Sequence, residues 1–179
     1  GAEQENDMLA NWRRSSGFTL VELIVVIAIV GVLAATALPR FITAQQDARI
    51  AKAQAIFGSI RSAAALAKSR CELDLARGLT AAGTCGNATV QVTMDGATVN
   101  IVNTYPAATA AGIDAAAQIN LTADGLTAAA GTIGACTGRV FRVNGAPGTT
   151  AGANTCAVCY EAAAAGPVAG DITVDVTNC

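Results

Sequence analysis

The chain contains no histidine among its 179 residues. Histidine is the base of Ser-His-Asp and Cys-His nucleophilic sites and the usual ligand of catalytic zinc. The sequence also has no GxxxxGK[ST] phosphate-binding loop and no GxGxxG turn after a strand. Because these residues and motifs are missing, we expect a protein that is not an enzyme and that uses neither a metal ion nor another cofactor.

Charged and aromatic residues are also scarce, at 13% and 4% of the chain. The 11 basic and 13 acidic groups leave a net charge of −2. Bulk electrostatics therefore predict no general attraction to nucleic acid.

The charges are unevenly distributed along the chain. The segment Arg40–Arg77 contains the acids Asp47, Glu72 and Asp74 but many more cations: Arg40, Arg49, Lys52, Arg61, Lys68, Arg70 and Arg77. After Arg77 the balance reverses, with Arg139 and Arg142 against Asp95, Asp114, Asp124, Glu161, Asp171 and Asp175. Two interpretations stay open: ordinary solvated surfaces, or complementary packing of basic and acidic regions between neighbouring copies.

One long apolar run is present, from Phe18 to Leu38, and its only charge is Glu22. About 20 apolar residues are enough to cross a hydrocarbon core. Arg13 and Arg14 stand just before the run, so its front end should be cytoplasmic and the rest of the chain should lie outside. A charge in such a span costs roughly 2.5–3.5 kcal/mol, so Glu22 needs either a partner or a protonated or snorkelling position near the membrane face.

Helix propensity stays high from Phe18 to about Arg70. In the second half an apolar stripe follows helical spacing, at Ile56, Ile60, Ala63 and Ala67. We therefore expect one helix of about 50 residues, roughly 75 Å long. Gly31 and Pro39 interrupt its first half and predict either a plain kink or a segment that melts when subunits pack.

After Arg77 the composition changes to Gly, Ala, Thr and β-branched residues, which is typical of strands and turns. Alternation predicts a hairpin with strands 89–93 and 98–102 around an Asp95-Gly96 turn. Further expected elements are a short helix at 109–119, strands at 138–143 and 156–161, and a possible fifth strand at 171–176. The fold class is therefore α+β, with the long helix packed on an antiparallel sheet of about four strands.

Six cysteines follow the apolar run: Cys71, Cys85, Cys136, Cys156, Cys159 and Cys179. An even number in an exported, membrane-anchored chain predicts three disulfides formed in an oxidising compartment, including a stapled C-terminal loop. Cys71 and Cys85 are the easiest pair, and Cys179 must reach back to Cys136, Cys156 or Cys159. Cys156 and Cys159 also form a CxxC, for which redox or metal-binding roles are the alternatives.

The segment GFTLVELIVVIAIVGVLAATALPRF, which begins at Gly17, resembles the N-terminus of a type IV pilin precursor of class a. The resemblance depends on Gly directly before Phe, Glu five positions after that Gly, and a Pro 17 positions beyond Glu22. The head is similar to mannose-sensitive haemagglutinin-type pilins in its segment 102–113. Its Cys156-Ala-Val-Cys-Tyr-Glu sequence and final Cys179 also fit that group, although Cys159 departs from the group's pattern.

The resemblance implies three regions. Residues 1–17 would be a leader; Met8 is an alternative native start, in which case residues 1–7 are not native. Residues 18–39 would form the transmembrane and filament-core helix, and residues 40–179 the globular head with the amphipathic half of the helix.

The resemblance also implies a maturation route. A prepilin peptidase would cut between Gly17 and Phe18 and N-methylate Phe18, and Glu22 would pair with the amine of Phe18 in a neighbouring subunit. The chain would be held in the inner membrane with a periplasmic head. An assembly ATPase and platform machinery would then polymerise it into an extracellular pilus, a helical homo-oligomer for adhesion, motility or DNA uptake.

Two other structural roles are compatible with these residues. One is a pseudopilin of a type II secretion system, and the other is a minor pilin at the filament tip. For the second, Arg139 and Arg142 flank Phe141 on an expected strand and could contact phosphate, although a solvated strand face is the simpler interpretation. No nucleic-acid partner is therefore established.

The resemblance predicts that Gly17→Val blocks maturation, because the scissile bond must enter a narrow peptidase site. Mass spectrometry should then find only the uncut chain. Normally cleaved and methylated Phe18 in this variant would contradict the prediction.

Overall fold

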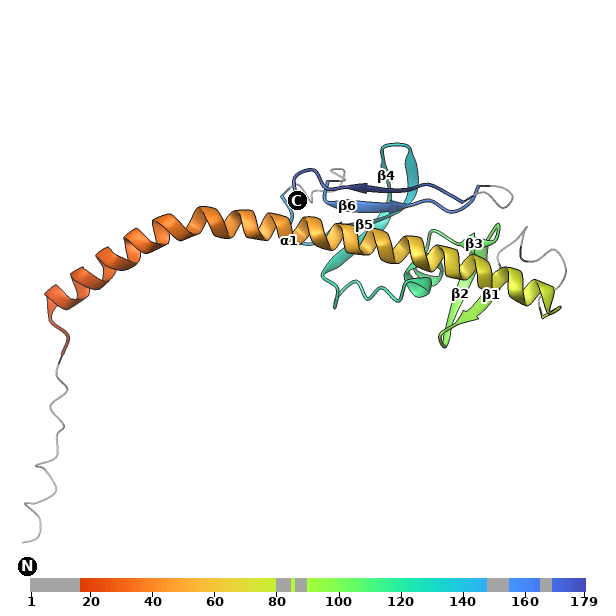
Figure 1. Ribbon diagram of the computed structural model, residues 1–179, viewed down its shortest axis with the longest axis horizontal. Helices are drawn as coiled ribbons and strands as arrows, with labels where there is room; N and C mark the ends of the chain where they lie inside the picture. The colour runs from red at the N-terminus through yellow and green to blue at the C-terminus, as the bar shows by residue number, and fades with distance from the viewer. Residues whose placement is uncertain (1–16, 80–84, 86–89, 148–154, 165–168) are drawn as a thin grey trace, which may run out of the picture. The chain divides into compact units, whose positions relative to one another are not determined.

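The computed structural model describes residues 17–79, 85, 90–147, 155–164 and 169–179 (Figure 1). The expected leader, residues 1–17, therefore lies outside the described residues except for Gly17. The chain divides into two units, Gly1–Ile42 and Thr43–Cys179.

A single long helix, α1, runs from Leu20 to Ala76 and contributes to both units. It ends six residues later than the expected end near Arg70, and the stop signal is Gly78. Gly78 adopts φ 68°, and the amide groups of Gly78 and Leu79 donate to the carbonyls of Leu75 and Asp74, both at 3.0 Å. This is the glycine-dependent C-terminal cap that satisfies the last carbonyls of a helix.

The second half of α1 buries one stripe of side chains. Ile60, Ala63 and Ala67 are buried and Ile56 is partly buried, which confirms the stripe predicted from the sequence. The stripe continues to Cys71, one turn beyond the predicted residues. Small alanines alternate with Ile60 along it, so the strands approach the helix closely.

The first sheet has three antiparallel strands, β1 (Val90–Met94), β2 (Ala97–Val102) and β3 (Tyr105–Pro106). The β1–β2 hairpin confirms the prediction, although Thr89 lies outside the described residues. Asp95 and Gly96 both have positive φ, 47° and 78°, as a tight two-residue turn requires.

The second sheet has four antiparallel strands in the order β4-β5-β6-β7. They are β4 (Leu126–Ile133), β5 (Cys136–Val143), β6 (Ala157–Tyr160) and β7 (Ile172–Asp175). The last three match the predicted strands. β4 was missed because its sequence, LTAAAGTI, is rich in alanine and has weak strand propensity. Instead, β4 forms because all eight of its residues pair with β5.

The predicted helix at 109–119 is present but shorter: a π-helical turn, η1 (Ala110–Asp114), passes into two α-helical residues, 115–116, and then a turn. The local reason is a close approach of the backbone at Gly112. The amide of Ile113 donates to the carbonyl of Ala107 at 2.9 Å, and a Cβ on Gly112 would clash with that carbonyl. The Ala-rich sequence suggested a regular helix because this tertiary contact is not visible in composition.

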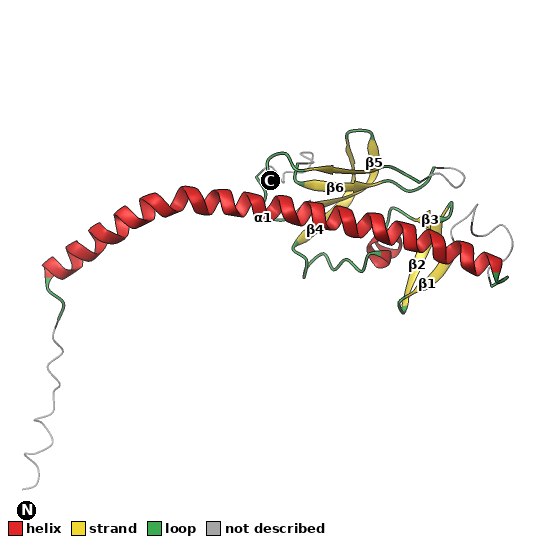
Figure 2. Cartoon of the chain, in the orientation of Figure 1, coloured by secondary structure: helices red, strands yellow, loops and turns green. Residues whose placement is uncertain are grey.

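In the second unit the strands of both sheets lie beside α1 (Figure 2). The core between them has three main clusters along the helix. Ala53 packs against β4, β5 and the C-terminal segment. Ile60 and Ala64 pack against Phe141, Val158 and Tyr160 of the larger sheet. Ala67 and Cys71 pack against the β1–β2 hairpin. The predicted α+β arrangement is therefore confirmed, with the strands divided between two sheets that share one helix.

All six cysteines form disulfides, paired as Cys71–Cys85, Cys136–Cys159 and Cys156–Cys179. The first joins the end of α1 to the segment before β1. The second joins β5 to β6, and the third joins Cys179 to Cys156, the residue just before β6, which confirms the stapled C-terminal loop. The two cysteines of the CxxC therefore bond to different partners.

Shortening a side chain in the buried stripe of α1 should lower the stability of the head. Ile60→Ala is expected to lower the free energy of unfolding by about 2–5 kcal/mol, because Ile60 is fully buried between the helix and the larger sheet. The measurement is denaturant unfolding of the full chain in detergent, followed by circular dichroism. Leu66→Ala on the same helix is the control, since Leu66 is 62% exposed and should cost little. Equal losses in the two variants would contradict the assigned packing.

Candidate functional site

The N-terminus of α1 is closed by a reciprocal pair of side chains, Thr19 and Glu22. The backbone amide and the hydroxyl of Thr19 each donate to Oε2 of Glu22 at 3.0 Å. The amide of Glu22 donates to Oγ1 of Thr19 at 3.2 Å. This is a capping box, in which each side chain satisfies a backbone donor that the first turn of a helix leaves open.

Glu22 therefore has a local role that the sequence prediction missed. The signal was present, because Thr-Leu-Val-Glu at residues 19–22 matches the S/T-x-x-E pattern before an apolar run. The box lies after the expected cut between Gly17 and Phe18, so cleavage there would leave it intact. Oε2 of Glu22 accepts both bonds from Thr19, which leaves Oε1 for a further partner.

Gly17 and Phe18 lie just before this cap and are exposed. Nothing lies within 4 Å of the position of a Cβ on Gly17, and the Phe18 side chain is 91% exposed. Phe18 and Glu22 line the same surface hollow, together with Val21, Val25 and neighbouring apolar residues. The structure thus places the predicted processing residues and Glu22 at one accessible end of the helix.

The apolar half of α1 contributes no side chain to a core. It contains a stretch of 18 residues that is long and apolar enough to cross a membrane, and none of that stretch is buried. Large side chains from Leu20 to Ile42 keep half or more of their surface exposed. Soluble monomers rarely expose so extensive an apolar surface, so lipid or other protein must cover it.

α1 continues through Gly31 and Pro39 without a break. Pro39 has no amide proton, so the helix lacks one i→i−4 bond there, and Gly31 contributes no side chain. The carbonyl that loses its donor is that of Ala35; the nearby hydroxyl of Thr36 donates to a different carbonyl, that of Leu33, at 2.9 Å. Melting of this segment during assembly stays a prediction.

In the head, Arg139 forms a buried ion pair with Asp114. Nε of Arg139 donates to Oδ1 of Asp114 at 2.6 Å, and a second nitrogen contacts Oδ2. The guanidinium also lies 5.7 Å from the centre of the Phe141 ring. Its side chain is only 15% exposed, so Arg139 holds β5 to η1 and does not present its charge to a phosphate.

Comparison with known proteins agrees with this geometry at the N-terminal end. The family described as the prokaryotic N-terminal methylation motif matches residues 12–38. Its matched range contains Gly17, Phe18, the Thr19–Glu22 capping box and the apolar run through Leu38.

A curated relative supports the same resemblance. The chain is 46% identical over 54 residues to the type IV narrow pilus major component PilA5 of Thermus thermophilus. The match covers 30% of this chain and 47% of PilA5, so it spans about half the length of that relative. No solved structure matches significantly. The resemblance to a type IV pilin is thus confirmed, whereas class a membership and the head similarity stay predictions.

The Arg139–Asp114 pair gives a test of the head's internal electrostatics. Asp114→Asn should lower the free energy of unfolding by about 3 kcal/mol, because it leaves the charge of Arg139 mostly buried without its partner. Glu72→Gln is the control, since its pair with Lys68 is 3.7 Å long and its side chain is 56% exposed. Denaturant unfolding of the full chain in detergent measures both, and equal small losses would contradict the structural role of Asp114.

Proposed function

We propose that this chain is the structural subunit of a type IV pilus filament. The observation that carries the proposal is the methylation motif at residues 12–38, continuous with a fully exposed apolar helix half. The same helix then anchors a head closed by three disulfides. The apolar helix half can lie in a membrane or be buried in a fibre, and the disulfide-bonded head can remain exposed on the fibre surface.

Maturation begins at the exposed end of α1. A prepilin peptidase cuts between Gly17 and Phe18 and methylates the new amine of Phe18. Until assembly the apolar half spans the inner membrane and the head faces the periplasm. The accessibility of Gly17 and Phe18 supports this step, because a protease must bind the scissile bond in an extended form.

Glu22 then directs assembly. A carboxylate in an apolar environment is costly, and the amine of Phe18 from a neighbouring subunit recovers much of that cost. The capping box holds the carboxylate in a fixed position at the helix start, so the pair also sets the axial offset between two subunits.

Filament growth exchanges lipid for protein around the apolar helices. An assembly ATPase and platform machinery extract the subunits, and the segments Phe18–Leu38 bundle in the filament core. Burial of this surface in a polymer surrounded by water is favourable by about 25 cal/mol per Å². Head-to-tail contacts that do not close produce an open helical fibre, which serves adhesion, motility or DNA uptake.

The decisive experiment separates the charge of Glu22 from its capping role. Glu22→Gln keeps a capping side chain because glutamine also completes a capping box, but it cannot form an ion pair. We expect Glu22→Gln and Glu22→Ala to accumulate in membranes and to lose filaments at least tenfold. Sheared surface material, examined by electron microscopy and immunoblotting, gives the measurement.

Thr19→Ala is the matched control, because it removes the cap and keeps the carboxylate. It should cost about 1 kcal/mol of helix stability and retain most filaments. Wild-type filament yield from Glu22→Gln, with loss in Thr19→Ala, would show that capping matters and the ion pair does not. Absence of filaments from the unaltered chain would overturn the proposed function itself.

A further inference from the structure

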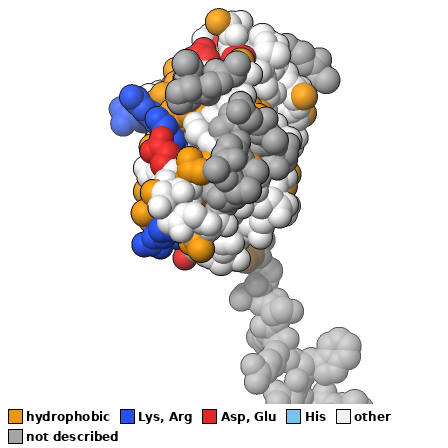
Figure 3. All heavy atoms as spheres, turned by 90° about the vertical axis from the view of Figure 1, so that its right-hand side faces the viewer, with side chains coloured by type: hydrophobic (Ala, Val, Ile, Leu, Met, Phe, Trp, Pro, Cys, Tyr) orange, Lys and Arg blue, Asp and Glu red, His pale blue; other side chains and the backbone are white. Residues whose placement is uncertain are grey.

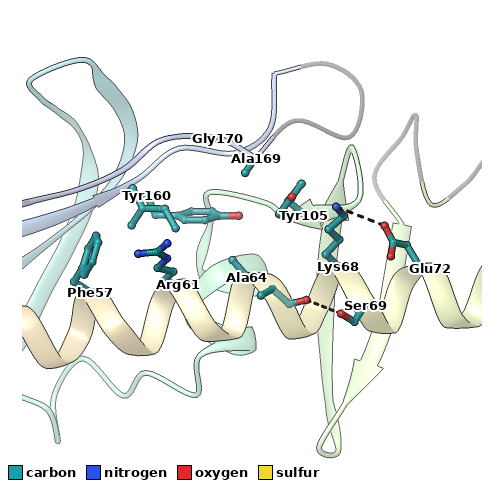
Figure 4. A pocket seen from close by; sticks show the side chains of 12 residues that line it. Phe57, Arg61, Ala64, Lys68, Ser69, Glu72, Tyr105, Tyr160, Ala169 and Gly170 are labelled. Atoms are coloured by element: carbon teal, nitrogen blue, oxygen red, sulfur yellow. Dashed lines mark hydrogen bonds and ion pairs between the residues drawn. The ribbon is translucent and has the colours of Figure 1, made fainter.

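The head has a groove of about 570 Å³ along one side of α1 (Figure 4). Its helix side is formed by Phe57, Arg61 and Ala64, and the opposite side by Tyr105 of β3 and Tyr160 of β6. It lies wholly within the unit Thr43–Cys179.

The apolar part of the groove is firmly held. The Tyr160 hydroxyl donates to the carbonyl of Pro106 at 2.7 Å, and this side chain is only 1% exposed, so burial raises its pKa. Tyr105 follows a two-residue turn in which Asn103 donates from Nδ2 to the carbonyl of Ala163 at 2.8 Å. The groove is therefore preformed, which lowers the entropy cost of binding a partner.

Two cations face this groove, and only one has an internal partner. Nζ of Lys68 lies 3.7 Å from Glu72 and 5.4 Å from the centre of the Tyr105 ring, and the contact with Tyr105 raises the pKa of Lys68. Arg61 has neither a hydrogen bond nor an ion pair to any described residue. Figure 4 shows its guanidinium rising from α1 toward the strand side of the groove.

The head has acids that lack a cation. The described residues form three ion pairs, Lys68–Glu72, Arg70–Asp74 and Arg139–Asp114. Five acids of the region after Arg77 take no part in them: Asp95, Asp124, Glu161, Asp171 and Asp175. On the face shown in Figure 3 the Lys and Arg side chains lie toward one edge, with Asp and Glu side chains beside them and others at the top.

We propose that this groove docks the acidic head surface of a second copy of this chain, with Arg61 as the cation that pairs with it. The inference rests on the proposed filament function and names a contact between heads within it. Charge complementarity selects the occupant, because among the described residues the head carries five acids outside any ion pair, and Arg61, beside Tyr105, has no ion pair either. Arg61 is exposed and Tyr105 half-buried, so both can contact a partner, and arginine and tyrosine are enriched among the residues that dominate binding energy at protein interfaces.

The first test reverses the charge in the groove. Arg61→Glu should lower filament yield about tenfold or more, because it places like charges against each other at the contact. Arg61→Lys keeps the charge and should retain most of the yield. Arg77→Glu makes the same net change just beyond α1 and outside the groove, and it should have little effect. Membrane abundance and disulfide-dependent gel mobility of each full-length variant verify folding.

The second test identifies the partner. In the Arg61→Glu background, each of the five acids is changed in turn to Lys, and one exchange should restore filaments at least fivefold. Unchanged filament yield in Arg61→Glu overturns this inference and leaves the proposed function standing. Loss that none of the five exchanges restores also overturns it and would point to a small anionic ligand. A wild-type chain that forms no filaments overturns both.

Discussion

The contact between the second half of α1 and the strands is the interaction on which the head depends. The buried stripe from Ala53 to Cys71 contributes to three core clusters, and the two sheets contact the same helix without forming one continuous sheet. The alanines of this stripe allow close approach, and Ile60 fills the space beside Phe141 and Tyr160. Disulfides then fix the ends of this arrangement, where the core is thin.

The first half of the same helix differs, because its apolar side chains have no core to pack into and need an outside partner to cover them. Between Leu20 and Leu38 apolar side chains cover the whole circumference, so no orientation against a head could bury them all. Only lipid or a bundle of like helices can surround such a rod. A capping box at Thr19 and Glu22 satisfies its first backbone donors before any partner arrives. One continuous helix therefore joins a region with its own packed core to a region whose apolar surface requires partners.

Most of the fold could be predicted because its signals are local. The stripe at Ile56–Ala67, the Asp95-Gly96 turn and the strands at β5, β6 and β7 each follow from periodicity or turn chemistry. β4 and the short π-helical form of the helix predicted at 109–119 could not be predicted, because both depend on contacts that alanine-rich composition does not show: the pairing of β4 with β5, and the close approach of Ala107 to Gly112. At the N-terminal site, Gly17, Phe18 and Glu22 were identified from spacing, whereas Thr19 was overlooked despite its capping pattern.

The sequence by itself determined the long helix, its apolar and amphipathic halves, and the even set of cysteines, because these depend on spacing along one chain. The tertiary structure alone decided how the four cysteines after Cys85 pair, that Asp114 neutralises Arg139, and that Arg61 lies beside two tyrosines with no ion pair among the described residues. Those outcomes depend on distances between residues far apart in the chain, and only the packing of α1 with both sheets sets them.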